Sequence, residues 1–254
     1  MKQTANDQTL TAIVTGASTG LGFAITKHFL SKDINVVMNA RTAADLEAAY
    51  QALGSPANAT IMVGDIANKS VGTDLVRAAE TKFGGLDILV NNAGVFSAKA
   101  FLDTEESDID RFYAINFKGA YFAAQAAVPV LQKRGGGAIV NGGTTLLEHA
   151  IAGYPASAAL ASKAALHSLT EQLSAEFGGD NIRVSTIATG IIETPLHAKQ
   201  GIEDTSGLAG LHLVNRIGKP EDIAEAVALL ATNDFISGTT LRVDGGHAAG
   251  HTFG

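Results

Sequence analysis

The chain alternates short runs of β-branched residues with longer stretches in which apolar residues recur at helical spacing. The runs predict strands at Thr11–Thr15, Asn35–Asn39, Thr60–Val63, Asp87–Val90, Ala138–Asn141, Ile182–Ile187 and Thr240–Val243. The longer stretches predict helices at Leu21–Ser31, Ala43–Leu53, Ser70–Phe83, Asp108–Gln132, Ala156–Phe177 and Glu221–Ala231. Because a helical crossover leaves the two strands that it joins parallel, we expect a doubly wound α/β fold. Its sheet should be predominantly parallel, with about seven strands and with helices on both faces.

The alternation runs from one end to the other without a linker rich in Pro or Ser and without an internal repeat. We therefore expect a single domain over residues 1–254. The segment Ile191–Leu213 is the exception, because its periodicity is weak and its polarity mixed. We expect it to leave the sheet and to act as a mobile substrate lid.

The charge and composition exclude several classes of function. A formal charge of −7 without clustered Lys or Arg argues against a nucleic-acid partner, and the absence of Cys excludes disulfides and thiol nucleophiles. No apolar run reaches the roughly 18 residues that a membrane span needs, and no secretion signal is visible, so we expect a cytoplasmic protein. His247 and His251 lie in a Gly/Ala-rich tail, and we interpret them as solvated residues, with no metal site.

A glycine-rich turn follows the first predicted strand and precedes the first predicted helix. It reads Gly16-Ala17-Ser18-Thr19-Gly20-Leu21-Gly22. Glycines let the backbone turn tightly and approach a pyrophosphate, whose charge the N–H groups at a helix N-terminus stabilise. In a βαβ unit this order of elements predicts a dinucleotide site and a Rossmann fold.

Several further motifs occur in an order that resembles the short-chain dehydrogenase/reductase family. They are the spacing Gly-x-x-x-Gly-x-Gly, Asp65-Ile66 after the third strand, Asn91-Asn92-Ala93-Gly94 after the fourth, Asn116 in a helix, and the segments 216–224 and 241–246. The resemblance covers nearly the whole chain. It implies an oxidoreductase whose cofactor contacts are made by Gly16, Ser18, Thr19, Gly20, Leu21, Gly22, Asp65, Ile66, Asn92, Ala93, Gly94, Lys163, Gly190, Ile192 and Thr194.

The end of the second strand favours NADP(H) over NAD(H). Enzymes that use NAD place a carboxylate there to accept hydrogen bonds from the ribose, and here the position is Ala40. Arg41 follows and could pair with the 2′-phosphate of NADP(H), so we assign it to the cofactor site. The alternative is that Arg41 merely begins a solvated helix. Thr19 stands where many NADP-using relatives have a second basic residue.

The resemblance also implies a proton donor, and here the sequence departs from the family. The family's Tyr-x-x-x-Lys helix keeps its lysine as Lys163, but the position four residues earlier is Ala159. Residues i and i+4 share one helix face, so a methyl group stands where the family has a phenol. Thr144 is the best match for the family's hydroxyl that orients the carbonyl, with Thr145 second. Asn116 matches the helix Asn of the catalytic set.

Tyr154 could supply the missing phenol through a rearranged loop. Against that, Pro155 marks the first turn of the predicted helix, which would put Tyr154 before the helix and more than two turns from Lys163. The alternative interpretation of Tyr154 is a loop aromatic that lines a substrate pocket. Glu148 and His149 are further protic groups in this loop, although both also fit a solvated loop.

Three functions are compatible with these residues. The first is an NADP(H)-dependent oxidoreductase that acts on a carbonyl or alcohol substrate with an atypical acid–base arrangement. The second is a catalytically silent NADP(H)-binding protein, and the third is a changed reaction such as a lyase or isomerase. The helices at 108–132 and 156–177 are apolar on more than one face, so we also expect a homodimer or homotetramer.

Overall fold

Seven strands form one sheet in the order β3-β2-β1-β4-β5-β6-β7 in the computed structural model, which describes residues 9–195 and 206–250. The strands are β1 (Thr11–Thr15), β2 (Asn35–Ala40), β3 (Ala59–Val63), β4 (Ile88–Asn91), β5 (Gly137–Thr144), β6 (Ile182–Thr189) and β7 (Thr240–Val243). Every pairing is parallel, which confirms the predicted sheet. The strand order reverses between β1 and β4, and ligands of such sheets bind at the carboxyl edge of this reversal.

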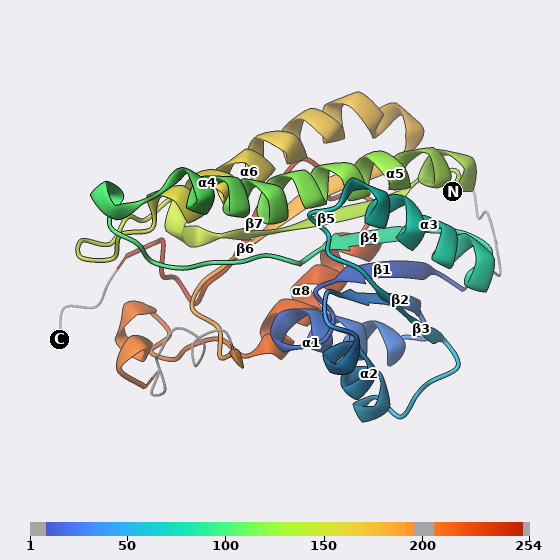
Figure 1. The fold of residues 1–254 in the computed structure, drawn as a ribbon, viewed down its shortest axis with the longest axis horizontal. Coiled ribbons are helices and arrows are strands. Elements are labelled where there is room, and N and C mark those ends of the chain that lie inside the picture. Colours follow the sequence, from blue (N-terminus) through green and yellow to red (C-terminus); the bar gives the residue numbers. More distant parts are fainter. Residues whose placement is uncertain (1–8, 196–205, 251–254) are drawn as a thin grey trace.

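Helices cover both faces of the sheet (Figure 1). They are α1 (Gly20–Leu30), α2 (Ala43–Ala52), α3 (Lys69–Phe83), α4 (Glu106–Phe112), α5 (Gly119–Arg134), α6 (Ser157–Phe177) and α8 (Pro220–Thr232). Residues of α1, α2 and α8 pack into one apolar cluster on one face, and residues of α3 and α5 pack into another on the opposite face. α6 lies over β5 and β6 on the same side as α5.

The continuous apolar runs of the strands follow from this double cover. In β1, Ala12 and Val14 belong to the cluster under α1, whereas Ile13 belongs to the cluster under α3, and all three are completely buried. A strand that is buried on both faces needs apolar residues at successive positions rather than at alternate ones. This is why the sequence shows β-branched runs without polar alternation.

The helix predicted at 108–132 is wrong in one respect, because the structure divides it. A π-helical segment, η2 (Tyr113–Lys118), separates α4 from α5 and contains Asn116. The Asn116 amide forms two hydrogen bonds to the backbone of Val95, so contacts with a distant loop hold the widened turn in place. Local periodicity carries no information about such contacts.

A chain of buried polar side chains crosses the sheet beneath the carboxyl ends of its central strands. Asn91 on β4 donates to Asn141 Oδ1 on β5 at 2.9 Å, and Asn141 donates to Thr170 Oγ1 on α6 at 2.9 Å. The Thr170 hydroxyl lies 2.7 Å from that of Thr186 on β6. The chain therefore links three strands and one helix through side chains, in addition to the backbone ladder.

The described parts of the predicted lid lie outside the sheet. Residues 196–205 of that segment lie outside the described residues, and its later part forms a 3-10 helix, η5 (Ser206–Leu211). Directly after it, the Val214 N–H donates to Gly245 O, which joins this region to the turn after β7. No helix in the described ranges is long and apolar enough to span a membrane.

The prediction of a solvated His247 is wrong. Its side chain is 1% exposed, and its ring packs against His149 and His212 with centroid distances of 5.3 and 5.4 Å. These partners come from separate loops, which explains why the Gly/Ala-rich surroundings gave no sign of burial. His251 lies outside the described residues. Within the described ranges, no group of three or more His, Cys, Asp or Glu is arranged to hold a metal ion.

Candidate functional site

The glycine-rich turn between β1 and α1 accepts no side chain at two of its positions. Gly16 has a φ of +67°, and a Cβ on Gly22 would lie 2.2 Å from Gly16 O. Asn92 closes the turn from the other side, because its amide donates to Thr15 O at 2.8 Å and to Gly16 O at 3.3 Å. The turn is thus fixed against the end of β4, with its backbone available to a ligand.

The N-terminus of α1 carries no anion of its own. Thr19 occupies the N-cap position without a side-chain capping bond, and the first turn holds no acidic residue. The free N–H groups and the positive end of the helix dipole therefore stabilise a bound anion such as a pyrophosphate. Ser18 and Leu21, both partly buried, flank this end of the helix. The turn and the helix end fit the diphosphate of a dinucleotide.

The loop after β4 reaches the same edge of the sheet. The backbone N–H groups of Asn92 and Ala93 both donate to Thr15 Oγ1, at 3.0 and 2.9 Å. Gly94 comes next, and a Cβ there would lie 3.0 Å from Lys163 Nζ and 3.2 Å from Asn116 Oδ1. A glycine at 94 therefore gives the lysine the room that its position requires.

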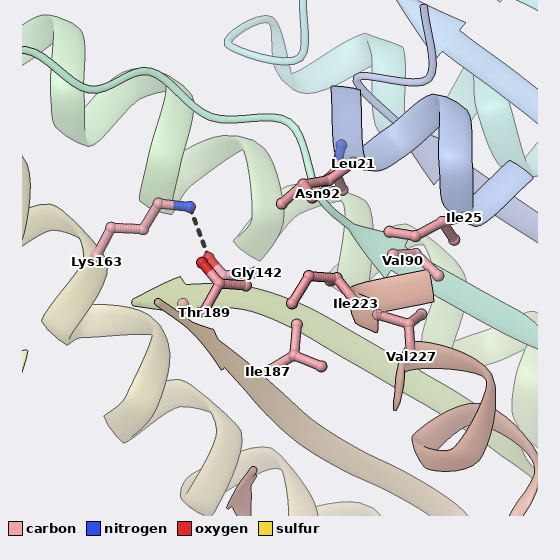
Figure 2. A pocket seen from close by; sticks show the side chains of 11 residues that line it. Leu21, Ile25, Val90, Asn92, Gly142, Lys163, Ile187, Thr189, Ile223 and Val227 are labelled. Carbon is pink, nitrogen blue, oxygen red and sulfur yellow. Dashed lines mark hydrogen bonds between the residues drawn. The ribbon is translucent and has the colours of Figure 1, made fainter. Parts of the chain in front are cut away.

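Lys163 extends from α6 to the carboxyl end of β5, where Nζ donates to Gly142 O at 2.6 Å (Figure 2). Burial lowers the pKa of Lys163 from its ordinary 10.5 to about 8. The side chain borders a cavity of about 70 Å³ whose other lining residues include Leu21, Asn92, Thr189 and Ile223. This cavity lies against the glycine-rich turn, at the predicted cofactor site.

Asn116 is held by three hydrogen bonds. Oδ1 accepts from the Val95 N–H at 2.8 Å, and Nδ2 donates to Val95 O at 3.0 Å and to Ser162 Oγ at 2.9 Å. Ser162 in turn donates to Ala159 O at 2.7 Å. The asparagine therefore fastens the loop after β4 to α6, one residue before Lys163.

Thr144 and Thr145 differ in what their hydroxyls face. Thr145 is fully buried, and its hydroxyl donates to Thr189 O at 3.1 Å. Thr144, at the end of β5, is only partly buried, and its Oγ1 accepts from the Leu146 N–H at 3.3 Å. The Thr144 hydroxyl proton is thus still available to a ligand, which agrees with its choice as the first candidate.

Tyr154 lies in the loop between β5 and α6. Its ring stacks on Phe96 with a centroid distance of 6.0 Å, and burial raises the pKa of its phenol. The assignment of Pro155 to the first turn of the helix is wrong, because α6 begins at Ser157 and Pro155 O accepts from the Lys99 N–H. Tyr154 therefore stands before the helix, as expected.

Glu148 and His149 are engaged at the other side of the same loop. Glu148 pairs with Arg242 of β7, and the His149 ring packs edge-on against His247. Neither contact was predicted from the sequence, because Arg242 and His247 follow these residues by about a third of the chain. The loop is thereby attached to β7 and to the turn that follows it.

The segment after β6 closes the carboxyl edge. Gly190 packs so closely that a Cβ would lie 2.8 Å from Asp244 Cα, and its N–H donates to Val243 O at 3.2 Å. Ile192 is buried and forms a single bridge with Gly218. The Thr194 side chain lies 3.5 Å from the point where a Cβ of Gly20 would be. This brings Thr194 beside the glycine-rich turn.

The outer strands place the remaining candidates at the same edge. Ala40 ends β2 and is 7% exposed, whereas Arg41 is exposed and forms no ion pair within the described residues. After β3, Asp65 Oδ1 accepts from the Ala67 N–H at 3.0 Å. The Ile66 side chain is buried in the core, so a ligand at this edge could contact only the Ile66 backbone.

A family model described as enoyl-(acyl carrier protein) reductase matches residues 16–248. A 3α-hydroxysteroid dehydrogenase of Mediterraneibacter gnavus is 31% identical over 240 residues, which cover 92% of this chain and 95% of the relative. The chain belongs to the short-chain dehydrogenase/reductase family. A galactitol 2-dehydrogenase of Cereibacter sphaeroides is 34% identical over 93% of this chain and 94% of the relative.

Solved structures of this short-chain dehydrogenase/reductase family have the same fold. A short-chain type dehydrogenase/reductase from Mycobacterium marinum matches with a TM-score of 0.88 and 27% identity, over 96% of this chain and 97% of that chain. A structure described as ElxO with NADP bound matches with a TM-score of 0.86 and 27% identity, over 96% of this chain and 100% of that chain. The Rossmann-type fold inferred from the strand pattern is thereby confirmed.

Sequence reasoning missed two contacts that position the lysine of this short-chain dehydrogenase/reductase. Gly142 O accepts a hydrogen bond from Lys163 Nζ, and Ser162 Oγ accepts one from Asn116 and so connects it to α6. A signal for Ser162 existed, because a polar residue adjacent to Lys163 in an Ala-rich helix must find a partner if it is buried. The Gly142 contact had no signal, since a carbonyl group is present at every residue.

Proposed function

We propose that this chain binds NADP(H) and moves a hydride between that cofactor and the carbonyl or alcohol carbon of a small substrate. The observation that carries the proposal is the convergence of Lys163 and the glycine-rich turn on one cavity at the carboxyl edge of the sheet. The relatives are named dehydrogenases and reductases, which supports an oxidoreductase. When bound, the reduced nicotinamide supplies the hydride.

The residues present fit a dinucleotide along its whole length. The N–H groups of the turn and of α1 would hold the diphosphate, Asp65 and the backbone of Ile66 would contact the adenine, and Lys163 would donate to the nicotinamide ribose. The segments after β4 and after β6 would hold the nicotinamide half. The residues assigned to the site are Gly16, Ser18, Thr19, Gly20, Leu21, Gly22, Arg41, Asp65, Ile66, Asn92, Ala93, Gly94, Lys163, Gly190, Ile192 and Thr194.

We assign NADP(H) rather than NAD(H) as the preferred cofactor because of two neighbouring residues. Ala40 offers no carboxylate to accept from the ribose hydroxyls, and none to repel a 2′-phosphate. Arg41 is exposed at the end of β2, where its guanidinium can form a bidentate pair with that phosphate. The relative with bound NADP supports the assignment.

The acid–base arrangement departs from that of the family. Thr144 orients the substrate carbonyl through its free hydroxyl proton, and Asn116 fixes the loop beside Lys163. Ala159 stands four residues before Lys163 on α6, where the family has its phenol, and a methyl group holds no proton to transfer. The reaction therefore needs a donor from elsewhere in the site.

A second candidate function follows from Ala159. Without a phenol at that position, the chain could bind NADP(H) and catalyse nothing, and so serve as a sensor or as a subunit of another enzyme. Changed chemistry, such as that of a lyase or isomerase, is the third candidate. The cofactor site is the same in all three, so turnover separates the first from the second.

The test measures NADPH oxidation with a panel of aldehydes, ring ketones and keto sugars, beside NADPH binding by fluorescence titration. Turnover with any carbonyl supports the oxidoreductase, and binding without turnover supports the silent protein. Gly22→Val is the control, because its Cβ would overlap Gly16 O and close the diphosphate cradle. This variant should lose binding and turnover together.

A further inference from the structure

One titratable side chain borders the cavity against the glycine-rich turn. Of the described residues that line it, only Lys163 carries an ionisable group, and the others are apolar, amide, hydroxyl or glycine residues. Figure 2 shows the Lys163 side chain extended from α6 towards Gly142 and Thr189. The amine therefore faces this cavity with no other ionisable lining residue beside it.

The surroundings of Nζ leave two of its three N–H bonds for other acceptors. Gly142 O takes one at 2.6 Å, and Nζ itself fills the space beside Gly94, where a Cβ would lie 3.0 Å from it. Thr144 follows Gly142 by two residues, so both lie on one face of β5, roughly 7 Å apart. Thr144 does not line the cavity, so a substrate carbonyl oxygen that accepts from both the ammonium and the Thr144 hydroxyl would extend beyond it.

No carboxylate forms an ion pair with Lys163 within the described residues. An ammonium that is buried without a counter-charge loses its proton more readily, and for Lys163 burial alone brings the pKa to about 8. A free phenol has a pKa near about 10, so this amine is the stronger acid of the two. It is also still mostly protonated at neutral pH.

His167, one turn after Lys163 on α6, keeps its Nε2 buried without a hydrogen-bond partner, and burial lowers its pKa, but its side chain does not line the cavity. Three protic groups of the loop between β5 and α6 have contacts elsewhere. Tyr154 stacks on Phe96, and burial raises the pKa of its phenol, which makes it a weaker acid. Glu148 pairs with Arg242, and His149 packs against His247. None of these three side chains lines the cavity that Lys163 borders.

We propose that the Lys163 ammonium is itself the proton donor in carbonyl reduction, in the place of the family's phenol. This inference rests on the proposed function. The carbonyl carbon receives a hydride, with its electron pair, from NADPH, and the π electrons move to oxygen. That oxygen takes a proton as one N–H bond of Lys163 breaks, which leaves an alcohol, NADP⁺ and a neutral amine. Water in the open cleft then returns a proton to the amine.

The first test separates proton donation from cofactor binding. Lys163→Arg keeps a positive charge and hydrogen-bond donors for the ribose, but a guanidinium does not release its proton near neutral pH. We expect kcat to fall about 10²–10⁴-fold while NADPH affinity, measured by fluorescence titration, changes much less. In Lys163→Ala, added primary amines should restore reduction in proportion to the concentration of their ammonium form. Lys133→Met, on the exposed end of α5, is the matched control.

The second test follows the ionisation of the amine. Reduction needs the ammonium, so kcat should be constant below pH 8 and fall about tenfold per pH unit above it, and Lys163→Arg should lack this descent. A readout without turnover is the rate of Lys163 acetylation in the cofactor-free protein, followed by mass spectrometry against pH. Its midpoint should lie near 8, well below the value of about 10.4 for an amine in a model lysine peptide measured in parallel.

Three results would overturn the proposal. They are a Lys163→Arg variant with unchanged kcat, a descent of kcat near pH 8 that persists in that variant, and an acetylation midpoint for Lys163 equal to that of the model lysine peptide. A protein that binds NADPH but reduces no carbonyl would instead refute the proposed function. In that case no residue would act as a proton donor, because there would be no reaction. The two failures are therefore distinguishable.

Discussion

Replacing Lys163 with Met should make the folded chain more stable. The structure keeps a charged amine in a site that lowers its pKa from 10.5 to about 8. A pKa difference of about 2.5 corresponds to about 3 kcal/mol of disfavoured charge at 1.36 kcal/mol per pH unit. Met removes that charge at similar length, although the bond to Gly142 O is lost with it. We expect the free energy of unfolding at pH 7 to rise by about 1–3 kcal/mol.

The pH dependence gives the sharper comparison. Because the folded pKa of Lys163 is lowered, the unfolded chain binds more protons between about pH 8 and 10.5, and stability contributed by this group rises with pH there. The free energy of unfolding of the unmodified protein is expected to be lower than that of the Met variant at pH 7. At pH 9.5 this difference should be smaller by about 2 kcal/mol. The Met variant lacks this gain, so the difference between the two proteins should narrow.

Urea denaturation at both pH values, at one fixed protein concentration, provides the measurement. All other titrating groups are shared by the two proteins and cancel in the difference. Lys133→Met, at an exposed position, should change neither the stability nor its pH dependence. A Lys163→Met variant that is less stable at pH 7, or that follows the unmodified protein at both pH values, would refute the argument from burial.

Four further outcomes are expected. Arg41→Ala should weaken NADPH binding by about 1–3 kcal/mol and leave NADH unchanged in fluorescence titrations; equal affinities in the unmodified protein would contradict the assignment of Arg41. Tyr154→Phe should retain kcat within about threefold because the stack on Phe96 survives, whereas a loss of about 10²-fold or more would make Tyr154 the acid. Ala159→Tyr should change carbonyl reduction by less than about tenfold, because Lys163 already supplies the proton; a gain of about 10²-fold or more would show that the chain lacks an effective acid. Light scattering at micromolar protein should give a dimer or tetramer, and a monomeric mass would exclude the predicted self-association.

The sheet could be predicted because each of its strands is marked by a short run of adjacent residues. Strands buried on both faces need unbroken apolar runs, and β1 shows this directly with Ala12, Ile13 and Val14. The glycine-rich turn was predictable for a similar reason, since Gly16 and Gly22 stand where no side chain fits. These two features predict the parallel sheet and the edge at which we propose that a dinucleotide binds.

The features that escaped prediction depend on residues far apart in the chain. The π-helical segment in the middle of the predicted helix is stabilised by Asn116, whose partners Val95 and Ser162 come from a loop and from another helix. His247 is buried by His149 and His212, which no local pattern indicates. The bond between Lys163 and a main-chain oxygen leaves no trace in the amino-acid sequence.

The polar chain from Asn91 to Thr186 has a consequence for how this protein can change over time. Each member satisfies its neighbour inside the core, so replacing one by an apolar residue leaves a buried donor or acceptor unpaired, at a cost of about 1–3 kcal/mol. Replacing both members of one link still leaves the next member along the chain without its partner, so only a change of the whole chain avoids that penalty. Asn91, Asn141, Thr170 and Thr186 should therefore co-vary as one group among descendants of this sequence.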